Sequence, residues 1–261
     1  MKKTLIDKLP HNMPSELYSL MGGCPVFDSS CSPEARVYFV SRDGGYYVKT
    51  SAKDSLATEA EMARYYHSLG LGVEVVEYIS LDFDWLVTKA ARGEDCTSKR
   101  YLDHPRRLAI KLGESLRALH EHDYTRCPVQ NRMQIYDATV RENYEKGIFD
   151  ADLFTGEFHF DSREQAYMEY IAAKDALADK VLLHGDYCLP NVIFDDWNLS
   201  AYIDIGNGGV GDRHIDLFWG VWTLWFNLKS YAYRDVFLDA YGRDKVDVSL
   251  LRVIAAAETF G

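Results

Sequence analysis

Short apolar segments separated by turn residues dominate the first third of the chain and predict β-strands there. Residues 37–40 and 46–49 are rich in valine and aromatic residues, and the turn at 42–45 between them predicts a hairpin. Residues 55–69 predict a helix, because Gly70 and Gly72 follow as stop signals. Residues 73–79 and 83–88 then predict two further strands.

From about residue 92 the apolar spacing becomes mainly helical. Residues 106–120 carry leucines on one stripe, at 108, 112, 116 and 119, as expected of a helix with one buried face. A helical pattern at 141–173 is interrupted around 150–161. Further helices are predicted at 217–233, 231–241 and 248–260. The pattern therefore predicts a β-rich start and a longer helical remainder.

Composition narrows the classes of protein that fit this pattern. The 261 residues, with 47% hydrophobic and 26% charged residues, can form one large globular domain or two lobes. A net charge of −11 argues against a nucleic-acid partner, since phosphate binding needs a basic face. The same charge is compatible with a cationic small molecule as substrate.

The chain shows no signal for a membrane or an oxidising compartment. No apolar run has the length of a membrane span, and the first residues lack the apolar stretch of a signal peptide. The five cysteines are odd in number, scattered and without metal-site spacing. They predict reduced thiols in a cytoplasmic protein.

Residues 182–216 carry the densest set of candidate chemical groups. An apolar run leads into Asp186, Asn191 follows five residues later, and a second apolar run carries Asp204. One carboxylate that accepts a proton, with an amide and a carboxylate that hold Mg²⁺, is the minimum set for phosphoryl transfer. Protein kinases place an aspartate, an asparagine and a following Asp-x-Gly in the same order.

A lysine and two glutamates upstream complete this set. Lys49 lies at the end of an apolar strand, where a surface lysine is the ordinary interpretation. The helix at 55–69 carries Glu59 and Glu61, and a glutamate-bearing helix after a lysine-bearing strand is the kinase arrangement for holding phosphates. We expect Glu61 to be the partner of Lys49, with Glu59 as the second choice.

The sequence resembles the aminoglycoside phosphotransferases, specifically their 3′-phosphotransferase branch. The motifs that carry the resemblance are HGDYCLPNVIF at 184–194 and YIDIGNGGVGDRHIDL at 202–217. Supporting matches are YYVKT at 46–50 and EAEMARYYHSLGLGV at 59–73. The matches follow the family's order over nearly the whole chain.

This resemblance implies an α+β, protein-kinase-like fold of two lobes. A small β-rich nucleotide-binding lobe would span residues 1–91, and a larger helical lobe residues 92–261. Asp186 would be the catalytic base, and Asn191 and Asp204 would hold Mg²⁺. Lys49, paired with Glu61, would position the triphosphate of ATP or GTP.

Further nucleotide contacts follow from the same resemblance. Tyr47 would stack on the adenine ring, and Ser32 belongs to the implied phosphate loop. The backbone between the two lobes, with Thr88, Ala90 and Ala91, would read the adenine edge.

On the acceptor side the resemblance implies a hydroxylated, cationic small molecule. The interruption at 150–161 carries Asp152 and Glu157, and is either a solvated loop or an acidic wall for such a ligand. Glu258 matches one member of an acidic pair at the family's C-terminus, with Ala257 in place of the other. A monomer or a dimer fits the resemblance.

Two further features depart from the family pattern. Asn207 stands where an arginine is usual, and the helix at 217–233 carries Trp222, Trp225 and Phe226 at positions where the family has charged residues. These changes predict a less acidic, more aromatic pocket, in which a ring-bearing substrate can stack. The alternatives are therefore a kinase for another hydroxyl compound and a nucleotide-binding protein without transferase activity.

Overall fold

The structure is a computed structural model that describes residues 3–31, 33 and 35–261. Its chain divides into two compact units. The first contains Met1–Thr97 and Pro190–Gly206, and the second contains Ser98–Leu189 and Asn207–Gly261. The segment at 190–206 joins the first unit because β9 (Val192–Asp195) pairs with β7 (Glu94–Asp95).

An antiparallel six-stranded sheet forms most of the first unit, in the order β1-β2-β3-β4-β6-β5. The strands are β1 (Thr4–Leu5), β2 (Val26–Asp28), β3 (Arg36–Val40), β4 (Tyr46–Ala52), β5 (Val75–Ser80) and β6 (Phe83–Lys89). The predicted hairpin is confirmed, since β3 pairs with β4 in the register Tyr38 to Val48. A smaller sheet has the order β10-β9-β7, with β10 at Asn198–Tyr202.

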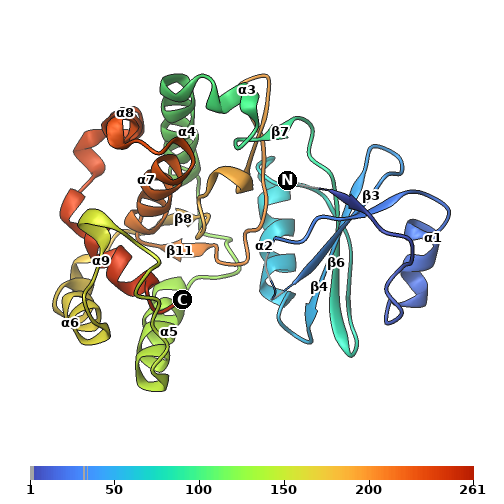
Figure 1. The fold of residues 1–261 in the computed structure, drawn as a ribbon, viewed down its shortest axis with the longest axis horizontal. Coiled ribbons are helices and arrows are strands. Elements are labelled where there is room, and N and C mark those ends of the chain that lie inside the picture. The colour runs from blue at the N-terminus through green and yellow to red at the C-terminus, as the bar shows by residue number, and fades with distance from the viewer. Residues whose placement is uncertain (1–2, 32, 34) are drawn as a thin grey trace. The chain divides into compact units, whose positions relative to one another are not determined.

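The six-stranded sheet lies between helix α1 (Tyr18–Met21) and helix α2 (Ala57–Ser68), as Figure 1 shows. Successive side chains of a strand point to opposite faces. Val48 therefore packs with Trp85, Val87 and Met21 in one core cluster. Across the sheet, Leu86 packs with Leu56 and Ala60 beside α2. Lys49, next to Val48 and opposite Leu86, lies on the α2 face.

The second unit is mainly helical. Its helices are α3 (Lys99–Leu102), α4 (Pro105–His120), α5 (Arg132–Lys146), α6 (Arg163–Ala173), α7 (His214–Leu228), α8 (Arg234–Tyr241) and α9 (Val248–Glu258). Two short strands, β8 (Val181–Leu183) and β11 (Gly209–Gly211), pair antiparallel. No helix among residues 3–31 and 35–261 combines the length and apolar character needed to cross a membrane.

The helices follow the predicted apolar spacing. The four leucines of the α4 stripe are fully buried, and α4 packs against α8. The predicted helical region at 141–173 forms two helices, because α5 ends at Gly147 with φ 75° and α6 begins after the N-cap Ser162. The β-rich first unit and helical second unit confirm the α+β prediction.

We predict that Gly113→Ala destabilises the fold. Helix propensity alone favours alanine by about 1 kcal/mol. A Cβ at Gly113 would, however, lie 2.5 Å from the carbonyl oxygen of Phe237 and 2.9 Å from Cβ of Ala240. Forcing α8 away should cost about 1–3 kcal/mol, measured as a lower Tm. The exposed neighbour Glu114→Ala should leave Tm nearly unchanged, and a stabilised Gly113→Ala protein would contradict this packing argument.

Candidate active site

Lys49 forms a bridge between two carboxylates of the first unit. Its Nζ atom lies 2.7 Å from Oε2 of Glu59 on α2 and 2.8 Å from Oδ1 of Asp204, which follows β10. The Lys49 side chain is only 21% exposed. A strand, a helix and a loop are thus fixed by a single ammonium group.

Burial and charge oppose each other in this cluster. Burial lowers the pKa of Lys49, but the attraction of Glu59 and Asp204 outweighs it, and the net pKa lies above that of an ordinary lysine. Burial raises the pKa of Glu59, and the nearby Asp204 carboxylate adds to the rise, while Lys49 opposes it. The ammonium therefore remains charged at neutral pH and offers positive charge to phosphate groups.

The prediction that Glu61 pairs with Lys49 is wrong. Glu59 makes the ion pair, and Glu61 is exposed on α2. Two residues along a helix rotate a side chain by roughly 200°, so only one of the two glutamates can face the sheet. The buried neighbours Ala60 and Ala63 mark the face that packs on the sheet, and Glu61 points away from it.

Asn191 and Asp204 lie at the same end of the β9–β10 hairpin. The amide of Ile203 donates to the carbonyl of Asn191 at 3.0 Å, which brings the residue before Asp204 against Asn191. Asp204 adopts the left-handed conformation with φ 57°, and about half of its side chain is exposed. Asn191 is buried, and only Asp204 reaches solvent. An amide and a half-exposed carboxylate fit Mg²⁺, which keeps several waters and binds one or two protein oxygens together with phosphates.

The expected nucleotide contacts fall on β4 and β6. Tyr47 and Thr88 are opposite each other on the α2 face of the sheet. The Tyr47 ring packs on the Phe39 ring, with 5.2 Å between the ring centroids. Ala90 donates its amide to the carbonyl of Gly45 at 2.9 Å, and the partly buried Ala91 follows it.

Ser32, assigned to the phosphate loop, lies outside the described residues.

Asp186 belongs to the second unit and follows β8 in a tightly fixed loop. Gly185 has φ 86°, and a Cβ there would lie 1.9 Å from the carbonyl oxygen of Asn207, so only glycine fits. The buried Asp216 carboxylate accepts hydrogen bonds from the amides of His184 at 2.8 Å and Gly185 at 2.7 Å. These bonds hold the backbone that carries Asp186.

Asp216, which holds the backbone of the Asp186 loop, was not among the residues predicted from the sequence to belong to the site. It lies on α7, and its carboxylate is also 3.0 Å from Nε2 of His120. Burial lowers the pKa of His120, which is therefore neutral and donates through Nε2 to Asp216. Nδ1 of His120 then accepts from the Tyr241 hydroxyl at 2.8 Å. The only sequence signal was its place at the end of the glycine-rich stretch.

Glu258, which the sequence predicts to contact the acceptor, lies at the end of α9 and has a fixed side chain. The Tyr136 hydroxyl donates to its Oε1 atom at 2.8 Å. Burial, together with the negative charge of Asp186, raises the pKa of Glu258 to about 7. The hydrogen bonds from Tyr136 and Trp219 and the positive charge of Arg132 oppose this rise. Its charge therefore changes close to neutral pH.

The two other predicted acceptor residues lie on the segment between α5 and α6. Asp152 is exposed in a turn, where its amide donates to Asp150. Glu157 forms an ion pair with Arg234 of α8. The charge of Glu157 is thus already compensated within the protein, whereas Asp152 faces solvent.

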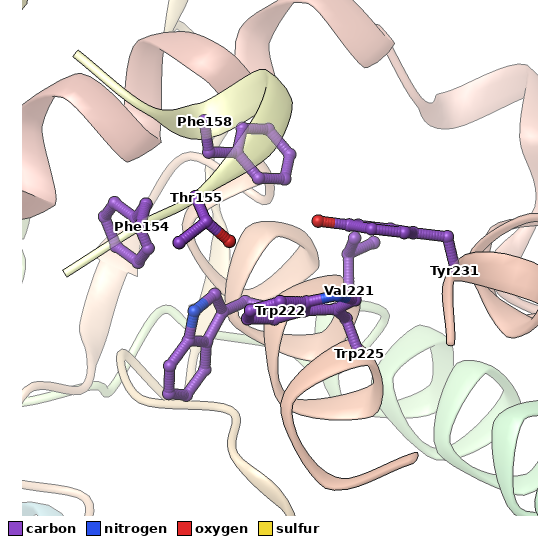
Figure 2. Close-up of a pocket in the computed structure, with 7 residues that line it drawn as sticks. All are labelled: Phe154, Thr155, Phe158, Val221, Trp222, Trp225 and Tyr231. Atoms are coloured by element: carbon purple, nitrogen blue, oxygen red, sulfur yellow. The ribbon is translucent and has the colours of Figure 1, made fainter. Parts of the chain in front are cut away.

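Aromatic side chains surround a small pocket in the second unit. Figure 2 shows its lining, which consists of Phe154, Thr155, Phe158, Val221, Trp222, Trp225 and Tyr231. Trp222 stacks on Phe226 at 4.9 Å, and Trp225 stacks on Tyr231 at 5.6 Å. Stacked rings therefore form the surface of α7 at the positions that the sequence analysis singled out.

Comparison with known proteins decides the family. A model of the family described as "Phosphotransferase enzyme family" matches residues 33–251, which is most of the chain. The chain belongs to this family. It is therefore a phosphotransferase, as the motifs around Asp186 and Asp204 predicted.

Individual relatives of this phosphotransferase agree. The chain is 42% identical, over 95% of both proteins, to a "Probable aminoglycoside 3′-phosphotransferase" of Lactococcus lactis. Its fold matches a crystal structure of an aminoglycoside 3′-phosphotransferase of type VIII with a TM-score of 0.80, 26% identity, and 94% and 97% of the two chains covered. A Streptomyces rimosus aminoglycoside phosphotransferase with ADP and streptomycin matches at a TM-score of 0.73 and 20% identity, over 86% and 90% of the chains. The predicted kinase-like fold is confirmed.

The two glutamates of α2 provide a matched test of the Lys49 bridge. Glu59→Gln should slow phosphoryl transfer roughly 10- to 100-fold, because the lysine loses a buried charge partner and its fixed position. Glu61→Gln should remain within about twofold of wild type, since Glu61 is exposed. Steady-state kinetics of both variants checks this, and equal losses would contradict the assignment.

The raised pKa of Glu258 predicts a pH-dependent effect on stability. Below the ordinary glutamate pKa the group is protonated in both states, and it costs nothing. As pH rises towards about 7, only the unfolded chain ionises freely, so stability is lost. Glu258→Gln should therefore raise Tm relative to wild type by about 2–4 °C near pH 8, and by less near pH 5. A pH-independent difference would show that the carboxyl titrates normally.

Proposed function

We propose that this phosphotransferase transfers the γ-phosphoryl group of ATP or GTP to the 3′-hydroxyl of an aminoglycoside. The observation that carries the transfer chemistry is the Lys49 ammonium held between Glu59 and Asp204. The acceptor is inferred from the relative that is 42% identical over 95% of this chain, whose name specifies an aminoglycoside 3′-phosphotransferase.

Binding of a nucleotide is supported by the same group of relatives. The Streptomyces rimosus protein, whose fold this chain shares, was solved with ADP and streptomycin. In this chain the strand-borne Lys49 would neutralise phosphate oxygens, while Tyr47 and the segment from Thr88 to Ala91 would bind the base. This role suits a lysine that stays charged and is positioned on two sides.

Asn191 and Asp204 would hold Mg²⁺. When bound, the ion neutralises negative charge on the phosphate oxygens. Asp204 serves a second purpose because it also fixes the position of Lys49. A single loop after β10 thus orients both the cationic side chain and a candidate metal ligand.

Asp186 would orient the acceptor hydroxyl and accept its proton. Phosphoryl transfer passes through a loose transition state, so that positioning contributes more than the strength of the base. The bonds from Asp216 to the amides of His184 and Gly185 supply that positioning. Asp186 therefore acts from a loop whose backbone is fixed before substrate binds.

A cationic acceptor fits the charge of the protein. The net charge is −11, and Glu258 and the exposed Asp152 are acids available on the acceptor side. The aromatic rings of α7 add surfaces on which ammonium groups or sugar rings can pack. They also keep a second candidate open, namely a kinase for another ring-bearing hydroxyl compound. Free cysteines and the relatives' chemistry agree with a cytoplasmic location.

The decisive experiment measures ADP release over a panel of aminoglycosides and other hydroxylated amines. Wild type should turn over aminoglycosides with a free 3′-hydroxyl and not their 3′-deoxy analogues. Asp186→Ala should lose about 10²–10⁴-fold in kcat, because the hydroxyl loses its proton acceptor.

The surface variant Asp239→Asn is the matched control and should behave as wild type, since its carboxylate only pairs with Arg243. Turnover of no aminoglycoside would refute the proposed acceptor. Unchanged turnover by Asp186→Ala would refute the catalytic assignment.

A further inference from the structure

Arg132, the first residue of α5, is a partly buried arginine with an unusual partner. Its Nη2 atom donates to Oδ1 of Asn207 at 2.7 Å, and a side-chain amide is neutral. The other partly buried arginines of the second unit each form an ion pair with a carboxylate; they are Arg117, Arg163, Arg213, Arg234 and Arg252. Among the residues that the structure describes, Arg132 has no carboxylate within ion-pair distance.

The surroundings of Arg132 place it beside the loop that carries Asp186. The backbone of Asn207 touches Gly185, the residue before Asp186. One helical turn after Arg132, Tyr136 donates to Glu258. Residues four apart on a helix lie on the same face. That face of α5 therefore lies close to Glu258 and to the loop that carries Asp186.

A guanidinium in this position can bind a further anion. A partly desolvated positive charge is unfavourable unless an opposite charge compensates it. Asn207 is neutral and accepts a hydrogen bond from only one of the five N–H groups of the guanidinium. Burial lowers the pKa of Arg132, and the charge of Glu258, which attracts the guanidinium from beyond ion-pair distance, opposes this. Arginine stays charged at neutral pH. An arginine also repels a cationic acceptor, so binding of the acceptor does not explain its presence.

We infer that Arg132 is a further catalytic residue, which binds the phosphoryl group as it reaches the hydroxyl held by Asp186. The planar guanidinium matches two phosphoryl oxygens at once. In the step, the bond from the γ-phosphorus to the nucleotide oxygen breaks, and a bond to the acceptor oxygen forms. The hydroxyl proton passes to Asp186, and Arg132 only neutralises charge. The inference rests on the proposed phosphotransfer.

Asn207 is then a positioning residue for Arg132. Its side-chain amide orients the guanidinium through Nη2 and leaves the remaining N–H groups for an anion. A carboxylate at 207 would bind the guanidinium more tightly and compete with the phosphoryl group. A neutral amide fixes the direction of the arginine while keeping its charge available.

The test compares Arg132→Ala and Arg132→Lys with the exposed control Arg126→Ala. Arg132→Ala should lose about 10²-fold or more in kcat, with the nucleotide KM little changed and the acceptor KM unchanged or lower, because a repelling charge is gone. Arg132→Lys should recover part of the rate, since it keeps the charge but not the planar fork. Millimolar methylguanidinium should restore at least a tenth of the lost rate in Arg132→Ala, and Arg126→Ala should match wild type.

A structural role would give a different result. It would lower Tm and kcat together, and added methylguanidinium would not restore activity. That outcome, or a kcat within about threefold of wild type, would overturn the inference.

If Arg132→Ala does not fold, the comparison rests on Arg132→Lys with the same readouts. If the wild-type protein phosphorylates no aminoglycoside, the proposed acceptor is wrong, but the inference about Arg132 can still be tested. Arg132 is then tested by its effect on ADP release with water as acceptor.

Discussion

A single ammonium between two carboxylates is the interaction on which the first unit depends. Strand alternation puts Val48 into the core and Lys49 on the opposite face, where α2 lies. Glu59 and Asp204 then approach the same Nζ atom from a helix and from a loop distant in sequence. Removing the ammonium would leave two buried or half-buried acids repelling each other. The charge that is proposed to bind phosphate therefore also stabilises the site.

In the second unit a buried carboxylate, that of Asp216, holds separate segments together as the Lys49 ammonium does in the first. The Asp216 carboxylate accepts hydrogen bonds from the backbone amides of His184 and Gly185 and from the His120 ring. The Tyr241 hydroxyl in turn donates to His120, which extends this chain of hydrogen bonds to α8. A buried carboxylate with three donors is well compensated, and it can hold a loop more rigidly than packing alone.

The sequence predicted correctly those elements that depend only on neighbouring residues. The hairpin around Tyr46, the leucine stripe of α4 and the spacing from Asp186 to Asn191 need only neighbouring residues, and the elements formed as expected. The choice between Glu59 and Glu61 failed because it depends on the rotation of α2 over the sheet. That rotation is set by packing of residues far apart in the chain.

Contacts between distant segments explain the other gaps. Asp216 of α7 accepts a hydrogen bond from Gly185, and Arg132 of α5 donates one to Asn207, whose backbone lies against Gly185. No spacing rule in the sequence connects these two residues to the Asp186 loop. Phosphoryl transfer to a cationic acceptor needs negative charge for the ammonium groups and positive charge for the phosphoryl oxygens within a few ångströms. In the proposed function, Glu258 of α9 and Arg132 of α5 would supply these opposite charges. Burial is the main cause that raises the pKa of Glu258 to about 7; the charge of Asp186 adds to the rise, and the charge of Arg132 opposes it. The hydrogen-bond partner of Arg132 is the neutral amide of Asn207 and not Glu258, so both charged groups remain open to a ligand.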